Sequence, residues 1–321
     1  MRAARFHQWG AAPRVDEVPE PARGDGEVLV QVQAAAVAHL DVTVATGEFA
    51  LKPPLPYIGG VEGAGVVLEA DADSGIAPGT QVILRGGGLG TLRDGTWTER
   101  VSVPRKAVTV LASPLPPEVA ATFFVPATTA YVAVHDVARV QPGEHVIVVG
   151  AAGAVGSMAA QQALAAGAAV TGVVGRTDQL ADVPKGVDAV DLSSASAIAP
   201  LAEARSASLL IDTLGGAGLI SRTRWVRPGG RAVVIGYVTG PRTEIDLPSW
   251  LLDDVALLPV NMIRQERRAR EVAGELAERL LAGELQVAVE RFGIADTARA
   301  VDALKSGRVR GRAVVVPDLS L

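Results

Sequence analysis

The sequence contains no cysteine among its 321 residues. This absence excludes disulfide bonds, thiolate nucleophiles and every zinc site that depends on cysteine ligands. Lysine is also scarce, because it occurs only at positions 52, 106, 185 and 305, and arginine supplies almost all of the positive charge. We interpret this bias as the codon preference of a GC-rich genome rather than as a binding surface.

Long apolar runs are missing as well. No stretch reaches the roughly 18 residues that a membrane-spanning helix needs, and the opening MRAARFHQWG has no apolar targeting core. We therefore expect a soluble, cytoplasmic protein without a membrane partner. The net charge of -5 and the pI near 5.5 argue against a nucleic-acid partner. With 49% apolar residues, a chain of this length suits two domains with sizeable cores.

The most informative pattern that is present is a strand, a glycine turn and a helix at residues 145–166. The apolar run His145–Val149 predicts a buried strand, the residues GAAGAVG at 150–156 predict a tight turn, and Ser157–Ala166 predicts a helix. This arrangement holds the pyrophosphate of a dinucleotide at the free N–H groups of the helix. Ala151 replaces one glycine of the strict fingerprint, so an ordinary loop between strand and helix is the alternative for the motif alone.

Downstream of the turn, short apolar runs alternate with helix-length segments. These runs are Ala169–Gly175, Ala189–Leu192, Leu209–Thr213, Arg231–Gly236 and Ala256–Asn261. Such alternation predicts parallel strands that are covered on both faces, and hence an α/β fold with a doubly wound Rossmann sheet. We place this nucleotide-binding domain at residues 123–261.

The first 122 residues have a different character. Alternating or apolar runs separated by turns predict strands at Val28–Ala35, Gly63–Ala70, Thr80–Leu84 and Trp97–Val103. Residues 262–321 contain two expected helices, Gln265–Leu281 and Ile294–Ser306, and a strand at Ala313–Val316. We expect this tail to fold back onto residues 1–122, so that both segments form one β-rich domain.

Several strings occur together in one order along the chain. They are LPYIGGVEGAGVV at 55–67, the glycine turn, IDTLGG at 211–216, RPGGR at 227–231 and GRAVV at 311–315. In this order the chain resembles the medium-chain dehydrogenase/reductase superfamily, and within it the zinc-independent quinone and enone reductases. The resemblance implies that the β-rich domain is a GroES-like catalytic domain. It also implies an NAD(P)H-dependent oxidoreductase.

The resemblance bears directly on zinc and on the substrate pocket. Ala38 stands where zinc-dependent members have a cysteine, and Val61 stands where they have a histidine, so we expect no metal. In the zinc-free branch the positions of Ala38 and Phe49 usually carry asparagine and tyrosine. Their replacement leaves an apolar wall and predicts a small apolar or carbonyl-containing substrate. Asn261 and Arg264, which follow the last strand, complete the expected substrate pocket.

We expect the cofactor to be NADPH, because Arg176 and Thr177 follow the second strand where NAD-preferring folds place an acidic residue. A solvated surface arginine is the alternative. The expected cofactor-binding residues are Thr129, Gly150, Gly153, Ala154, Val155, Gly156, Gly175, Arg176, Thr177, Asp212, Thr213, Gly236 and Tyr237.

His39 and Tyr131 are the candidate proton donors. His39 fits a structural histidine or a pyrophosphate contact as well, and Tyr131 fits a domain-interface aromatic residue. The predicted reaction is hydride transfer from NADPH to an α,β-unsaturated carbonyl compound or a quinone. A non-redox enzyme on the same scaffold and an NADPH-binding protein without turnover are the alternatives. The apolar strand Ala256–Asn261 at a sheet edge further predicts a homodimer.

Overall fold

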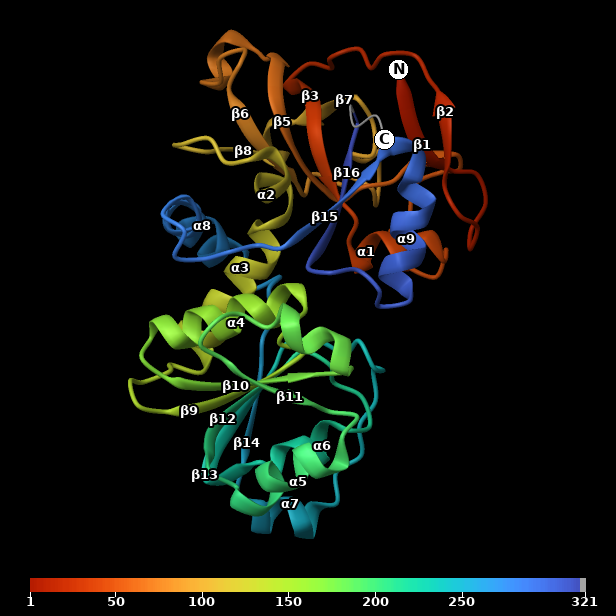
Figure 1. The fold of residues 1–321 in the computed structure, drawn as a ribbon. Helices are drawn as coiled ribbons and strands as arrows, with labels where there is room; N and C mark the ends of the chain where they lie inside the picture. The colour runs from red at the N-terminus through yellow and green to blue at the C-terminus, as the bar shows by residue number, and fades with distance from the viewer. Residues whose placement is uncertain (318–321) are drawn as a thin grey trace. The chain divides into compact units, whose positions relative to one another are not determined.

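The computed structural model describes residues 1–317, which fold into two compact units (Figure 1). Unit 1 combines Met1–Phe124 with the chain from Val287 onward, and unit 2 comprises Val125–Gln286. The chain therefore leaves unit 1, completes unit 2 and returns to unit 1.

Unit 2 is built on a six-stranded parallel sheet. Its strands are β9 (His145–Val149), β10 (Ala169–Val174), β11 (Asp188–Asp191), β12 (Ala207–Asp212), β13 (Val226–Val234) and β14 (Ala256–Pro259). They lie in the order β11-β10-β9-β12-β13-β14, and every neighbouring pair is parallel. The strand order reverses between β9 and β12, and open sheets of this kind bind ligands outside the carboxyl ends of the strands at that point. The predicted Rossmann sheet is confirmed.

The helices of unit 2 connect these strands or pack beside them. They are α3 (Phe124–Tyr131), α4 (Ala154–Ala165), α5 (Ala195–Ala204), α6 (Leu219–Thr223), α7 (Leu247–Asp253) and α8 (Glu266–Leu281), with a π-helical segment at Val132–Val137. Strand β12 is buried along its whole length, which explains the apolar run Leu209–Ile211 before Asp212.

Unit 1 contains two antiparallel-rich sheets. The larger one has the order β15-β16-β3-β5-β6-β8, with β7 also paired to β3, and the smaller one has the order β2-β1-β4. Its strands are β1 (Arg2–Phe6), β2 (Arg14–Glu17), β3 (Glu27–Ala36), β4 (Tyr57–Ile58), β5 (Glu62–Glu69), β6 (Gln81–Arg85), β7 (Arg100–Pro104), β8 (Val108–Val110), β15 (Val289–Gly293) and β16 (Arg312–Val316). Helices α1 (His39–Ala45), α2 (Pro117–Thr122) and α9 (Thr297–Lys305) complete it.

The core of unit 1 joins both sheets. Phe6 of β1 stacks on Tyr57 at a ring distance of 5.2 Å and meets Trp97 at 5.8 Å. Strand β16 pairs with β3, so the tail of the chain returns to the N-terminal segment as predicted. The β-rich fold agrees with the expectation from the sequence.

The point of return differs from the prediction. Residues 262–286 were expected in the catalytic domain, but they belong to unit 2. Arg268 of α8 forms an ion pair with Asp136 at 3.0 Å, and the side chain of Gln161 on α4 bonds the backbone of Gln286 in both directions. Helix α8 therefore belongs to the nucleotide-binding unit, an assignment that the amphipathic pattern alone leaves open.

Element boundaries differ in smaller ways. Strand β13 begins at Val226 rather than at Arg231, and α4 begins at Ala154 rather than at Ser157. Strands β1 and β2 were not predicted from the sequence. Within residues 1–317 no helix combines the length and the apolar character needed to cross a membrane.

Candidate functional site

The glycine turn has the geometry that the sequence suggested. Gly150 follows β9 with φ +80°, and a Cβ atom there would lie 2.3 Å from Oγ1 of Thr213. A Cβ atom on Gly156 would lie 2.1 Å from the carbonyl oxygen of Gly150, so strand and helix approach too closely for any side chain. Glycine is required at both positions, at the first for conformation and space and at the second for close packing.

Helix α4 starts at this turn, and its first N–H groups have no carbonyl partner within the helix. The first helical hydrogen bond runs from Ser157 N–H to the carbonyl of Gly153 at 2.9 Å. The N–H groups of residues 154–156 precede it, and Gly153 offers no capping side chain. These amides and the positive end of the helix dipole form a place where an anion is stabilised.

The departure from the strict fingerprint at Ala151 has a structural explanation. The methyl group of Ala151 is fully buried, and a Cβ atom on Gly172 of β10 would lie only 2.8 Å from it. The glycine that the fingerprint would place at 151 is thus replaced by alanine, while Gly172 on the adjacent strand leaves room for the methyl group.

The loops after β9 and β12 meet across the switch point of the sheet. Thr213 donates its hydroxyl hydrogen to the carbonyl of Val149 at 2.8 Å. The loop after β13 lies close by, because a Cβ atom on Gly236 would be 2.7 Å from the Thr213 carbonyl oxygen. The structure therefore brings Gly150, Thr213 and Gly236, three expected cofactor-binding residues, to one edge of the sheet. Tyr237 follows them and is 72% exposed.

Asp212 lies at the same edge, but its carboxylate is committed to the protein itself. Oδ1 accepts hydrogen bonds from the N–H groups of Leu214 and Gly215, and Oδ2 accepts one from Arg222 at 2.6 Å. The residue is completely buried. Asp212, expected among the cofactor-binding residues, thus shapes the loop from beneath.

Arg176 and Thr177 follow β10, and the side chain of each bonds a nearby carboxylate. The Arg176 guanidinium contacts Asp178 at 3.0 Å, and Thr177 donates to Asp191 at 2.5 Å. The hydrogen bond from Thr177, together with those from Ser193, lowers the pKa of Asp191.

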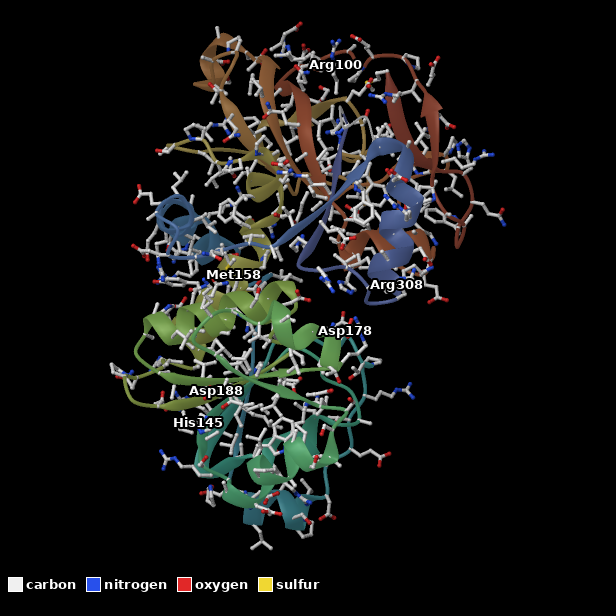
Figure 2. The ribbon with its side chains drawn as sticks, in the orientation of Figure 1. Arg100, His145, Met158, Asp178, Asp188 and Arg308 are labelled. Atoms are coloured by element: carbon white, nitrogen blue, oxygen red, sulfur yellow. The ribbon has the colours of Figure 1, made fainter. Side chains whose placement is uncertain are left out.

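Asp178 lies at the opposite edge of the sheet from His145 and Asp188, which mark the amino ends of β9 and β11 (Figure 2). Gly175, at the end of the strand, donates its N–H to the side chain of Gln179 at 3.2 Å.

Thr129 and Tyr131 both lie on α3. Gln162 of α4 donates to the carbonyl of Ala127, which fixes α3 and the buried Thr129 against α4. The Tyr131 hydroxyl accepts a hydrogen bond from Arg268 at 3.3 Å, and the same guanidinium lies 5.2 Å from the centre of the Tyr131 ring. Tyr131 therefore joins α3 to α8.

Asn261 and Arg264 form a turn after β14. Oδ1 of Asn261 accepts the backbone N–H of Arg264 at 3.2 Å, and both residues are exposed. The amide oxygen of Asn261 is thus used locally, whereas the Arg264 guanidinium lies at the surface of unit 2.

In unit 1, the buried carboxylate of Asp41 organises the expected substrate wall. Oδ2 accepts the N–H of Ala38 at 2.8 Å, and Oδ1 accepts the N–H groups of Gly60 at 3.1 Å and Val61 at 3.0 Å. Burial raises the pKa of Asp41 to about 7, and the nearby carboxylate of Glu62 adds to the shift. One side chain therefore holds the backbone at both positions that the resemblance compares with zinc ligands.

A second buried acid lies beside this wall. Glu62 pairs with Arg312 of β16 at 3.3 Å, and both side chains are nearly inaccessible. Burial raises the pKa of Glu62, and the charges of Arg312 and Arg85 oppose that rise. Partial desolvation and the charge of Arg312 lower the pKa of His39, so its imidazole is held in the neutral form near pH 7.

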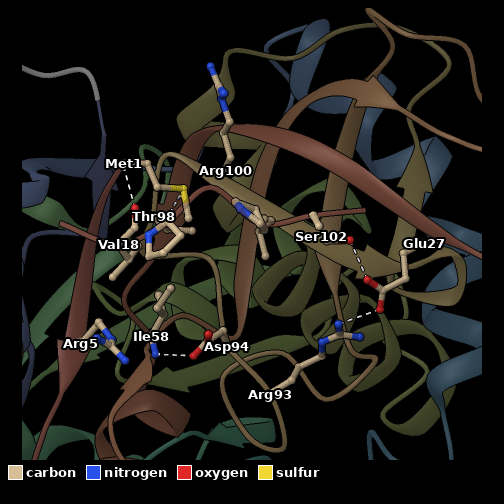
Figure 3. A pocket seen from close by; sticks show the side chains of 14 residues that line it. Met1, Arg5, Val18, Glu27, Ile58, Arg93, Asp94, Thr98, Arg100 and Ser102 are labelled. Atoms are coloured by element: carbon tan, nitrogen blue, oxygen red, sulfur yellow. Dashed lines mark hydrogen bonds and ion pairs between the residues drawn. The ribbon is translucent and has the colours of Figure 1, made fainter. Parts of the chain in front are cut away.

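Phe49 is half-buried and packs against the core of unit 1. A cavity of about 470 Å³ also lies in unit 1, but none of the expected site residues lines it. Figure 3 shows that Glu27, the one glutamate that lines the cavity, accepts hydrogen bonds from Arg93 at 2.7 Å and from Ser102 at 2.6 Å. The lining cations Arg5 and Arg100 pair with acids outside the cavity, and we assign the cavity no role. Among residues 1–317, no three His, Asp or Glu side chains gather in a way that could hold a metal ion.

Three residues of this geometry were missed by sequence reasoning: Asp41, Asp178 and Arg222. Asp41 could have been found, because an acid in the first turn of a helix can accept the amide that precedes the helix. Arg222 carried no local signal, since the chain is rich in arginine and nothing near it in sequence marks it as buried.

Family models match two segments of the chain. The alcohol dehydrogenase GroES-like domain matches residues 24–113, and the zinc-binding dehydrogenase model matches residues 185–315. The chain is 29% identical over 251 residues to quinone oxidoreductase-like protein 2 of Rattus norvegicus, covering 76% of this chain and 70% of that protein.

Solved structures share the whole fold. A probable oxidoreductase from Mycobacterium abscessus is 28% identical with a TM-score of 0.82, over 98% of this chain and 99% of that one. The quinone oxidoreductase of Escherichia coli complexed with NADPH has a TM-score of 0.84 at 21% identity, over 99% of this chain and 100% of that one. At this identity the second likeness supports the fold alone, and the expected pairing of a GroES-like domain with a Rossmann domain is confirmed.

Proposed function

Because this chain belongs to the medium-chain dehydrogenase/reductase superfamily, we propose that it is an NADPH-dependent, zinc-independent reductase of quinones or α,β-unsaturated carbonyl compounds. The observation that carries the proposal is the glycine turn. Gly150 and Gly156 leave space that any side chain would fill, and the amides of residues 154–156 are presented to an anion. These features fit the pyrophosphate of a dinucleotide.

The preference for NADPH rests on Arg176. A guanidinium offers two parallel donors to a phosphate, and Arg176 follows β10 at the position where the adenosine ribose is read in this fold. The NADPH complex of the Escherichia coli quinone oxidoreductase, which shares the fold, agrees with this choice.

When bound, NADPH supplies a hydride from C4 of its nicotinamide to an electron-poor carbon. The residues of the chain bind and orient the reactants. Ala38, Phe49 and Val61 offer the substrate an apolar surface, and Asp41 keeps the backbone of Ala38 and Val61 in place. The side chains of Ala38, Phe49 and Val61 cannot donate a hydrogen bond. Backbone amides, cofactor hydroxyls or water therefore stabilise the negative charge that develops on the carbonyl oxygen of the substrate.

Independence from zinc follows in this proposal from the side chains themselves. Ala38 and Val61 provide hydrocarbon where zinc-dependent members provide two ligands. In this proposal the proton that completes the reduction comes from solvent, because the lowered pKa of His39 leaves little imidazolium to donate it near pH 7.

Unit 2 also has an apolar surface that we assign to a second copy of the chain. Leu247, Leu251 and Leu252 of α7 are 59%, 70% and 84% exposed, and the neighbouring β14 is an edge strand of the sheet. An exposed edge next to an apolar patch favours pairing with an identical surface. We therefore propose a homodimer built on α7 and β14.

The function is tested by measuring the binding of NADPH and NADH to the purified protein and then following NADPH oxidation with a panel of enones and quinones. Steady oxidation with at least one class supports the proposal. Tight binding without turnover of any of them would instead favour a binding protein, and the loss of polar side chains at positions 38 and 49 is what makes this alternative worth testing. Substrate conversion without net NADPH oxidation would favour a non-redox enzyme.

A further inference from the structure

The loop from Thr213 to Gly218, between β12 and α6, is held by hydrogen bonds to the segments on both sides of it. Thr213 is fastened to the end of β9 through its hydroxyl group. Thr239, from the loop after β13, donates its backbone N–H to the carbonyl of Leu214 at 2.9 Å and its hydroxyl to the carbonyls of Leu214 and Gly215 at 3.1 and 3.0 Å. The loop is therefore anchored on β9 at one side and on the loop after β13 at the other.

The backbone of this loop leaves no space for a side chain at Gly215 or Gly216. Gly215 and Gly216 have φ values of +62° and +68°. A Cβ atom on Gly215 would lie 2.6 Å from the carbonyl oxygen of Gly236, and one on Gly216 would lie 2.4 Å from Oγ1 of Thr239. Both glycines combine a left-handed conformation with close approach to the next loop.

The buried ion pair of Arg222 and Asp212 completes this anchoring from below. Arg222 donates from Nε to Oδ2 of Asp212 at 2.6 Å and from Nη2 to the carbonyl of Gly215 at 2.7 Å. Asp212 in turn accepts the N–H groups of Leu214 and Gly215. The pair thus bonds Gly215 at both its N–H and its carbonyl group, while the side chains of Arg222 and Asp212 are only 8% and 0% exposed.

Burying an arginine and an aspartate is a costly way to stabilise a fold, because an apolar pair of similar volume is often as stable. The better attested use of such a pair is to select one conformation among several. Here the selected conformation belongs to a loop at the switch point, where β9 and its glycine turn lie on one side and β12 lies on the other.

We propose that Arg222 is a positioning residue for the nicotinamide cofactor. Through Asp212 and the Gly215 carbonyl it fixes residues 213–216 as a preformed rim on the β12 side of the switch point. This assignment rests on the proposed function, and it gives Asp212 a role beneath the rim rather than in contact with the cofactor.

The test separates conformation from stability. The double variant Asp212→Asn/Arg222→Met removes both charges, and the amide oxygen that it leaves at position 212 still accepts from Leu214 and Gly215, so we expect near-parental stability in urea denaturation. Without the donor to Gly215, hydrogen exchange in residues 213–218 speeds up and the NADPH dissociation constant rises by about tenfold or more. The matched control is Arg224→Leu, because Arg224 lies two residues further on, is half exposed and pairs with Asp253. This control leaves cofactor binding unchanged.

Each outcome decides the assignment. A double variant that is stable and binds NADPH with parental affinity overturns it, since Arg222 is then only structural. If the double variant does not fold, Arg222→Lys decides, because it keeps the charge beside Asp212 and loses the second donor: slower cofactor association with faster loop exchange supports the assignment, and parental values overturn it. A parent protein that binds neither NADPH nor NADH overturns the proposed function first, and the assignment with it.

Discussion

The guanidinium of Arg176 is held by the carboxylate of Asp178, with Nε 3.0 Å from Oδ1 and Nη2 3.3 Å from Oδ2. A phosphate presents a similar pair of oxygens to a guanidinium. The 2′-phosphate of NADPH must therefore share Arg176 with Asp178 or displace it, and cofactor preference becomes a competition between two anions.

This competition gives the first prediction. Asp178→Asn strengthens NADPH binding, whereas Arg176→Ala weakens it roughly tenfold, or about 1.4 kcal/mol, and neither change alters NADH binding comparably. Titration calorimetry with both cofactors provides the measurement, and Asp188→Asn, at the opposite edge of the sheet, is the control. An Arg176→Ala protein with unchanged NADPH affinity would remove Arg176 from the cofactor site.

Two glycines on helices should respond in opposite ways to alanine. Gly156→Ala places a methyl group 2.1 Å from the Gly150 carbonyl oxygen, so it destabilises unit 2 by about 1–3 kcal/mol and weakens cofactor binding. Gly274→Ala, on α8 with open space around it, stabilises the protein by roughly 0.5–1 kcal/mol. Urea denaturation of both variants measures the difference, and equal effects would contradict the close packing at the turn.

Glu144 links pH to the stability of unit 2. It accepts two hydrogen bonds from Arg231, at 2.8 and 2.7 Å, and these hold the pKa of its carboxyl at about 2, below the ordinary 4.5. The stabilisation is present above pH 4.5 and is lost as the pH falls towards 2. Glu144→Gln therefore lowers the unfolding free energy by about 1–3 kcal/mol near pH 7, and the difference from the parent shrinks on acidification. A constant difference from about pH 7 to about pH 3 would be inconsistent with this ion pair.

Asp41 acts in the opposite direction. Burial raises its pKa to about 7 from 3.8, so the folded state keeps a proton that the unfolded state has already lost. Its contribution to stability is fully present below pH 3.8 and declines as the pH rises to about 7. In Asp41→Asn this decline disappears, although the loss of one acceptor costs about 1–3 kcal/mol. Denaturation between about pH 4 and pH 8, with the exposed Asp73→Asn as control, checks whether the pH slope of the Asp41 variant is the shallower one.

The proposed dimer rests on a surface that one charge can disrupt. Leu252 is 84% exposed on α7, and Leu252→Asp places a carboxylate among its exposed leucines. We expect the variant to have the mass of a monomer in light scattering at micromolar concentration. Leu92→Asp, at an exposed leucine of unit 1, keeps the parental mass. A monomeric parent protein would exclude the dimer at once.

The fold was largely predictable because its signals are local. Most strands of the parallel sheet centre on a short apolar run, and Gly150 and Gly156 mark a turn whose backbone excludes side chains. Strand β2 was missed because it is mostly exposed and carries no apolar alternation. The partner of α8 was also missed, since an amphipathic helix specifies that one face is covered but not by which domain.

By itself, the sequence determined the two kinds of domain and the place of the glycine turn, because strand patterning and steric exclusion act between residues that are close along the chain. The tertiary structure decided which polar groups already have hydrogen-bond partners within the protein. Asp41 holds Gly60 and Val61 from another segment, Arg222 reaches back to Asp212, and Arg268 on α8 engages Tyr131. Hydrogen-bond partners of this kind are set by packing in three dimensions, and no spacing along the sequence encodes them.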